Sequence, residues 1–347
     1  MDSVPRRSPR ALALTALQYG VAVAALAWVV LQVDPGATLA RLGRVDAPTL
    51  LALLAVTLVG LGARFSTWQA VMAPVHPVGF RTAASTDLIV NFVNQLLPSR
   101  LSGRVAAPFV LRSQTGMAYA DAAAVSGVHT GVYAVYYGLA AAAGLAVAVA
   151  LTGLSTGLVL LLGLSTGLYL AAGAVVLVAG TNLRLLDPLV ESLAGAIARL
   201  PRVGDRAAER VRGLLAFTEA STESFRRLVA DPGVWVRYAL GWAVALVLAP
   251  GLRVLLLFGA LGVAFEPAAL LPLYLVTAYS VTLLPLTPGG IGVTEATATA
   301  VFVALGVPGE VAVPVVVIDR TLGVYLPAVA GWYPSLGLDL SDLSSGQ

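Results

Sequence analysis

Charged residues embedded in apolar stretches are the side chains best suited to chemistry in this chain, which is 58% hydrophobic and only 11% charged. Ionisable groups at membrane depth are costly, and they face a cavity or a partner. Asp319 and Arg320 lie in the middle of an apolar run. Glu295 stands near the start of a potential helix, where it could act as a cap, pair with Arg320 or Arg253, or take up a proton during transport. These residues predict a polar site inside the membrane.

A second candidate site is a set of arginines between residues 100 and 112. If the chain is helical from Gly103 onward, Arg104 and Arg112 share roughly one face, and Arg100 lies one turn before them. Guanidinium groups bind phosphate in a bidentate manner, so this basic wall would suit a phospholipid or polyprenyl-phosphate head group. The alternative is that these arginines reach out to ordinary lipid phosphates at the membrane surface.

Neutral polar side chains accompany both candidate sites. Asn91, Asn94 and Gln95 could bond head-group oxygens, or they could satisfy the backbone of a broken helix. His129 lies alone in a span rich in Ala, Gly and Tyr, where it could pack through a hydrogen bond or carry a proton. The residue types do not decide between these roles.

The candidate residues cluster around two helix-breaking motifs, one in each half of the chain. The stretch LLPLTPGGIGVTEATATA, residues 283–300, would be a membrane-length apolar run without its prolines and glycines. A weaker echo is NQLLPSRLSGRVAAPFVLR at residues 94–112, whose Leu-Leu-Pro lies 187 residues before the Leu-Leu-Pro of the second motif. Irregular backbone at bilayer depth needs protein or water to satisfy its polar groups, so each break predicts a cavity. The residues expected to form the breaks are Pro98 and Gly103 in the first, and Pro285, Pro288, Gly289, Gly290 and Gly292 in the second.

The paired LP segments, with PGGIG-x-x-E in the second, resemble a family of flippase-like integral membrane proteins related to the membrane region of lysylphosphatidylglycerol synthases. The resemblance covers residues 11–332. It implies flipping of an aminoacylated, glycosylated or polyprenyl-linked lipid. The first hairpin departs from the family pattern, because Arg104 stands where an acidic residue is expected, and His129 lies near the place of an expected arginine.

Composition excludes several classes of protein and site. A chain with a mean hydropathy of +0.88 cannot fold as a soluble globule. The absence of cysteine excludes disulfides, thiolate catalysis and cysteine metal sites, and two histidines make a histidine-rich metal centre improbable. We therefore expect no cofactor and no metal. No basic patch is interleaved with aromatic residues in a soluble domain, so nucleic-acid binding is not suggested.

The apolar runs predict an all-α polytopic membrane protein with about six full transmembrane helices and two re-entrant broken hairpins. A first span at residues 11–33 would be about 35 Å long as a helix. An arginine-rich stretch at 181–237 predicts an amphipathic cytoplasmic loop. The other expected spans cover 49–72, 122–151, 154–180, 234–263 and 310–332, and the hairpins cover 82–111 and 268–305.

The number of membrane crossings, which must be even between two cytoplasmic segments, then fixes the orientation of the two halves of a single transmembrane domain over residues 1–335. If the N-terminus and the central loop are both cytoplasmic, the hairpin at 82–111 cannot itself cross the membrane. Half one, about 49–151, and half two, about 234–334, then have opposite orientations and form an inverted repeat, as in many secondary transporters. Eight full crossings would also keep parity. The last residues, 336–347, form a polar tail, and the C-terminus is expected in the cytoplasm.

Three functions remain open from the sequence. A lipid translocator in the cell membrane would move an anionic, aminoacylated, glycosylated or polyprenyl-phosphate lipid through a basic cavity. A membrane-embedded transferase is less favoured, because the chain lacks an Asp-x-Asp motif and paired carboxylates for a metal. An accessory subunit of a partner transferase or synthase is the third possibility. The substrate, the energy source and the oligomeric state stay open.

Overall fold

The computed structural model describes residues 45–96, 100–183, 187–198, 204–284 and 286–338, together with glycines 20, 36 and 43. Across these ranges the secondary structure is helical, with turns between the helices and no strand. The predicted all-α membrane fold is confirmed. The first expected span, residues 11–33, lies outside the described residues apart from Gly20, as does most of the expected polar tail.

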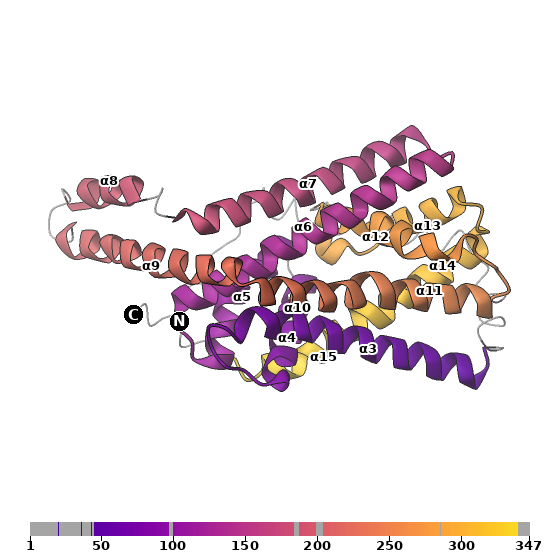
Figure 1. Ribbon diagram of the computed structural model, residues 1–347, viewed down its shortest axis with the longest axis horizontal. Helices are drawn as coiled ribbons and strands as arrows, with labels where there is room; N and C mark the ends of the chain where they lie inside the picture. The colour runs from indigo at the N-terminus through magenta and orange to yellow at the C-terminus, as the bar shows by residue number, and fades with distance from the viewer. Residues whose placement is uncertain are drawn as a thin grey trace.

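Five helices in the described ranges are long and apolar enough to cross a membrane, and they correspond to five of the six predicted spans. They run along the long axis of the molecule (Figure 1). Two are composite, with a π-helical turn inside: α10 and α11 are joined by Val244–Leu248, and α14 and α15 by Thr321–Tyr325. Their bounds are α3 Ala47–Met72, α6 Tyr119–Leu151, α7 Thr156–Thr181, α10–α11 Pro232–Ala260 and α14–α15 Gly309–Ser335.

Local signals explain where these long helices begin. The Asp46 carboxylate accepts a hydrogen bond from the Thr49 backbone N–H at 3.0 Å and caps α3. Asp231 does the same for Gly233 at 2.7 Å, and Pro232 occupies the first turn of α10. Such caps satisfy backbone donors that have no partner within the helix. The polar residues at the ends of the apolar runs therefore define the helix ends.

The two predicted hairpins form helix–break–helix units. The first consists of α4 (Phe80–Leu96) and α5 (Arg100–Thr115), and the second of α12 (Leu271–Tyr279) and α13 (Val293–Ala304), with short 3-10 turns at Ala268–Leu270, Ser280–Leu283 and Pro288–Gly290. The units lie toward opposite ends of the molecule, the first toward the end that carries α8 and α9 (Figure 1). The break of the second unit contains the predicted Pro288, whereas Pro98 and Pro285 are outside the described residues.

Gly103 does not break the chain as predicted, because it lies inside α5, which already begins at Arg100. A glycine in a helix interior costs only about 0.5–1 kcal/mol relative to alanine, so it does not interrupt a helix that packing supports. The helix also tolerates Pro108 in its interior.

The second break depends on the backbone freedom of its glycines. Gly289, Gly290 and Gly292 have φ angles of +60°, +76° and +81°, which side chains rarely adopt. The Thr287 hydroxyl donates to the Ile291 carbonyl at 2.8 Å across the turn. The second break thus folds as a compact, hydrogen-bonded turn.

The tips of the two units touch each other. A Cβ atom on Gly289 would lie only 2.0 Å from Oε1 of Gln95, which is in the last turn of α4. Two segments almost two hundred residues apart in sequence, one from each half, therefore meet inside the molecule.

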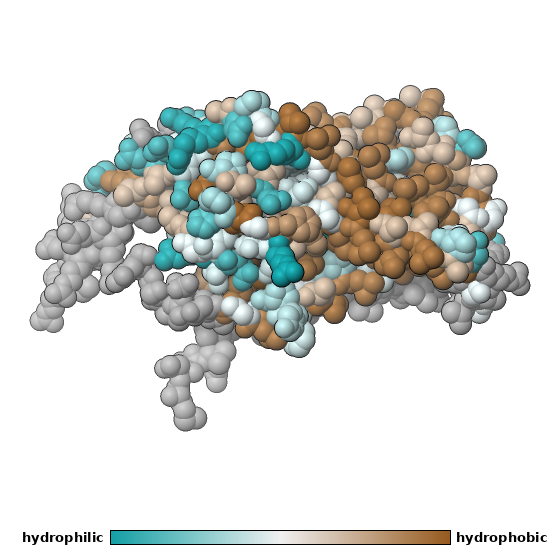
Figure 2. All heavy atoms as spheres, turned by 60° about the horizontal axis from the view of Figure 1, so that its bottom comes forward, coloured by the Kyte–Doolittle hydropathy of each residue, from teal (hydrophilic) through white to brown (hydrophobic). Residues whose placement is uncertain are grey.

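Helices α8 (Asp187–Ala198) and α9 (Gly204–Ala230) form a pair that extends beyond the long helices (Figure 1). They fall in the stretch predicted as an amphipathic loop, but the second half of α9 packs on the long helices. Its Phe225 ring lies against Gly127 of α6 and Gly180 of α7, where no Cβ would fit. Figure 2 shows hydrophilic residues gathered toward this end and a broad hydrophobic surface over the rest.

Candidate functional site

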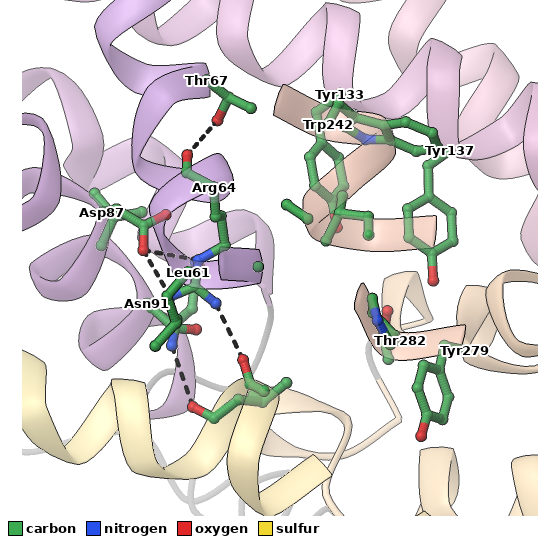
Figure 3. Close-up of a pocket in the computed structure, with 18 of the residues that line it drawn as sticks. Leu61, Arg64, Thr67, Asp87, Asn91, Tyr133, Tyr137, Trp242, Tyr279 and Thr282 are labelled. Carbon is green, nitrogen blue, oxygen red and sulfur yellow. Dashed lines mark hydrogen bonds and ion pairs between the residues drawn. The ribbon is translucent and has the colours of Figure 1, made fainter. Parts of the chain in front are cut away.

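A cavity of about 170 Å³ lies among the long helices and the two helix–break–helix units. Its lining comes from α3, α4, α6, α10, α11, α14, both π-helical turns and the end of α12. One side carries charged and amide groups, and another carries aromatic rings (Figure 3). The charged and amide residues of the lining are Arg64, Asp87, Asn91, Asn94, Arg253, Asp319 and Arg320.

The first ion pair joins α3 to α4. Nη2 of Arg64 lies 2.6 Å from Oδ2 of Asp87, and Nε donates to the same oxygen at 2.8 Å. The guanidinium also donates from Nη1 to the Gly323 carbonyl at 3.1 Å (Figure 3). Arg64 thereby links the first half of the chain to the last long helix.

The second ion pair joins α11 to α14. Nε and Nη2 of Arg253 both lie 2.8 Å from Oδ1 of Asp319. The Tyr279 hydroxyl, from the end of α12, donates to Oδ2 of the same carboxylate at 2.8 Å. Arg253 and Asp319 are each less than 5% exposed, so this ion pair is shielded from bulk solvent.

The third ion pair joins the second break to α14. Nε of Arg320 donates to Oε1 of Glu295 at 2.9 Å, and the Tyr325 hydroxyl donates to the same oxygen. The other oxygen, Oε2, accepts the backbone N–H of Gly292 at 2.7 Å. Glu295 is therefore both the cap of α13 and the partner of Arg320, two roles that the sequence presented as alternatives. Arg320 lines the cavity, and Glu295 lies behind it.

These contacts leave the charges balanced. Each of the three arginines described above, of which Arg253 and Arg320 are buried and Arg64 is partly buried, has its own carboxylate. Removing one member of a buried ion pair typically lowers the free energy of unfolding by about 3–5 kcal/mol, because the other charge is left uncompensated. The ion pairs thus form a fixed, electrically neutral part of the cavity lining.

Aromatic side chains make up a further part of the lining. The rings of Trp68 and His129 stack with centroids 3.8 Å apart, and Tyr133, Tyr137 and Trp242 continue the surface. The Tyr238 hydroxyl lies 3.1 Å from both Nδ1 and the carbonyl of His129. His129 is thus held by stacking and hydrogen bonding, and its ring also borders the cavity.

Apart from Nη2 of Arg64, which lies in ion contact with Asp87 at 2.6 Å, three buried polar atoms of the lining have no hydrogen-bond partner among the described residues. They are Oδ1 of Asn94, Nε1 of Trp242 and Nη2 of Arg320. Buried polar atoms are nearly always hydrogen-bonded, so a group of such atoms around one space marks a place for a polar ligand or water.

The two π-helical turns also border the cavity. Gly323 and Val324 of the turn in α14–α15 accept hydrogen bonds through their carbonyls, from Arg64 at 3.1 Å and from Asn91 at 3.2 Å. A π-helical turn disturbs the regular hydrogen-bond ladder of a helix, and such turns occur often at functional sites. Here the disturbed carbonyls dock the first half of the chain onto the last long helix.

The structure brings together only part of the predicted site. Asn94, Asp319 and Arg320 line the cavity and Glu295 supports it, next to the break formed by Pro288 and the three glycines. Asp319 and Arg320, although adjacent, turn to different partners. Arg112 lies in the last turn of α5 and is not among the lining residues, and the side chains of Arg100 and Arg104 are outside the description.

Sequence reasoning missed the Arg64–Asp87 pair and the aromatic side of the cavity. Arg64 and Asp87 stand in apolar or moderately apolar segments, which was a usable signal, but their separation of 23 residues fits no helical spacing. Arg253 was considered as a partner of Glu295, and the structure assigns it to Asp319 instead. The tyrosines at positions 133 and 137 are four residues apart and share a face of α6, a pattern that packing alone could explain.

One comparison with known proteins gives a match. A family model described as the lysylphosphatidylglycerol synthase TM region matches residues 15–331. No curated protein and no solved structure matches the chain.

Proposed function

Because this chain belongs to the family of the lysylphosphatidylglycerol synthase TM region, a multi-pass membrane family, we propose that it translocates lipid head groups across the cell membrane. The head group would enter the cavity while the acyl chains stay in the bilayer. The observation that carries this proposal is the buried polar cavity among helices long and apolar enough to span a membrane.

The arrangement of the helix–break–helix units supports alternating access to that cavity. The two units lie toward opposite ends of the molecule (Figure 1), and Gln95 of the first lies against Gly289 of the second. We propose that they are re-entrant hairpins of an inverted repeat, inserted from opposite faces of the membrane. In transporters of that design the substrate site lies near the bilayer midplane, between the repeats.

The arginines of α5 have a separate proposed role. Arg112 lies outside the cavity lining, at the end of α5, and Arg100 and Arg104 belong to the same helix. We propose that this helix, entering from the cytoplasmic side, contacts the phosphate of the lipid before or after its head group occupies the cavity. Guanidinium groups suit this task because they pair with phosphate oxygens in a bidentate manner.

A leaflet-exchange assay tests the proposed translocation. Purified protein in liposomes, with fluorescent phospholipid or glycolipid probes and with or without ion gradients, should accelerate exchange of at least one probe between leaflets relative to empty liposomes. Arg64→Gln should slow that exchange, because it removes contacts with both Asp87 and the Gly323 carbonyl. The matched control is Arg237→Gln, since the Arg237 side chain is 55% exposed and its ion contact with Asp231 is long, at 4.0 Å.

The same assay separates the alternatives. A covalently changed lipid, identified by mass spectrometry, would favour a membrane-embedded transferase. Neither exchange nor a changed lipid would point to an accessory subunit of a partner transferase or synthase.

A further inference from the structure

Resting on the proposed function, we infer that the group entering the cavity is an uncharged sugar ring carried by a lipid. The first reason is size. An engineered cavity of about 150 Å³ in another protein accommodates benzene, a single six-membered ring. The cavity here is about 170 Å³, which is enough for a single six-membered ring.

The second reason is charge. Each guanidinium of the site, buried or partly buried, already has a carboxylate at 2.9 Å or less. Tyrosine hydroxyls occupy further acceptor positions on Asp319 and Glu295. A phosphate or an ammonium group entering this cavity would add a charge with no free counter-charge, in a place where desolvation is costly. A neutral ligand leaves the balance intact.

The third reason is the set of polar atoms that lack partners. Nε1 of Trp242 and Nη2 of Arg320 are donors, and Oδ1 of Asn94 is an acceptor. Arg320 is 2% exposed and Trp242 is 6% exposed, so water reaches neither side chain freely. A hydroxyl group both donates and accepts, so one sugar ring with several hydroxyls satisfies all three atoms without carrying a charge.

The fourth reason is the aromatic side of the cavity. The rings of Trp68, Tyr133, Tyr137 and Trp242 offer rigid apolar surfaces with polar edges. A pyranose ring is itself amphipathic, with C–H groups on its faces and hydroxyls around its rim. Its faces can pack on the aromatic rings while its rim meets the donors and the acceptor, which is the usual composition of a small-molecule pocket.

Native mass spectrometry in a non-glycosidic detergent tests this inference with three lipids of identical acyl chains: monoglucosyl diacylglycerol, phosphatidylglycerol and phosphatidylethanolamine. We expect the glucolipid to bind most tightly. Trp242→Phe, which removes one donor and keeps a ring, should weaken its binding about fivefold, the usual effect of one lost hydrogen bond. Asn94→Ala should weaken it to a similar extent, and the matched control Trp332→Phe should not, because Trp332 is 55% exposed and outside the lining.

The outcomes separate this inference from the proposed function. If phosphatidylglycerol or phosphatidylethanolamine binds most tightly, and Trp242→Phe weakens that binding, the inference of a sugar ring is wrong. The proposed lipid translocation would still stand. If Trp242→Phe and Asn94→Ala alter the binding of none of the three lipids, the cavity is not a head-group site. Both proposals would then fail together.

Discussion

At the scale of single residues, the Glu295–Arg320 pair is the most constrained contact of the site. Glu295 is 1% exposed and also holds the Gly292 N–H and the Tyr325 hydroxyl. The Arg320 guanidinium lies over the Tyr279 and Tyr325 rings, with centroids 5.6 and 5.4 Å away. Cation–π contacts of this kind gain strength when the cation is desolvated. The pair therefore connects the second break to the last long helix.

A double-mutant cycle should show strong coupling between these two residues. We expect Glu295→Gln or Arg320→Gln alone to cost about 3–5 kcal/mol, because each strands a buried charge, and the double variant to cost much less than their sum. Unfolding in detergent measures both effects.

The matched control for this cycle is the Asp231–Arg237 pair, whose side chains are 41% and 55% exposed. Coupling there should stay below about 1 kcal/mol, as is usual for exposed ion pairs. Additive effects of Glu295→Gln and Arg320→Gln would show that the two side chains do not support each other.

The residue types in the sequence predicted the Glu295–Arg320 pair but not the other two ion pairs of the site. Glu295 stands three residues after a glycine break, and Arg320 interrupts an apolar run, so both signalled a site. The partner of Arg64 depends on how α3 packs on α4, and the partner of Arg253 on how α11 packs on α14. No spacing along the chain encodes either packing.

At the scale of the elements, the second break was predictable because its prolines and glycines act on the local backbone. Its contact with α4 was not, because that contact depends on how α4 packs against the Pro288–Gly290 turn. The predicted break at Gly103 was wrong, because a glycine permits irregular backbone without requiring it. Gly103 lies inside α5, where the backbone stays helical.

Substitution of Gly289 should test the contact between the two breaks. Gly289→Ala places a methyl group 2.0 Å from Oε1 of Gln95, at a φ of +60° that already costs alanine about 1–2 kcal/mol. We expect it to lower the thermal midpoint more than Gly306→Ala. Gly306 has a φ of +89° with nothing within 4 Å of its added Cβ, so it reports the backbone cost alone.

Adding Gln95→Ala to Gly289→Ala should bring the midpoint close to that of Gly306→Ala, because it removes the atom that the methyl group meets. Equal decreases in the thermal midpoint for Gly289→Ala and Gly306→Ala would indicate that Gln95 and Gly289 are not in contact in solution.

At the scale of the whole molecule, the hydrophilic surface gathers at the end that carries α8 and α9 (Figure 2). The arginine-rich composition of this region predicted a cytoplasmic position, by the tendency of basic residues to stay inside. Hydropathy predicted the spans well because a membrane helix must be apolar over a fixed length. The packing of Phe225 against α6 and α7, which anchors α9, left no such signal.

Labelling of single cysteines should establish this orientation, since the chain contains no cysteine of its own. Ser192→Cys lies on an exposed position of α8 and should react with a membrane-impermeant maleimide only after the cells are opened. Val329→Cys is the matched control: Val329 is 68% exposed but lies in α15, so lipid should shield it in both conditions. Reaction of Ser192→Cys in intact cells would reverse the topology.

The π-helical turn at Thr321–Tyr325 has a consequence for changes in chain length. Such a turn holds one more residue than the α-helical turn it replaces, so it behaves like a one-residue insertion that the helix absorbs locally. Deleting one residue there would leave α14 and α15 in their present orientations, whereas a deletion in regular helix rotates everything beyond it by about 100°. The deletion would withdraw the carbonyls that receive Arg64 and Asn91. Homologous chains shorter by one residue at this point should therefore also differ at both positions.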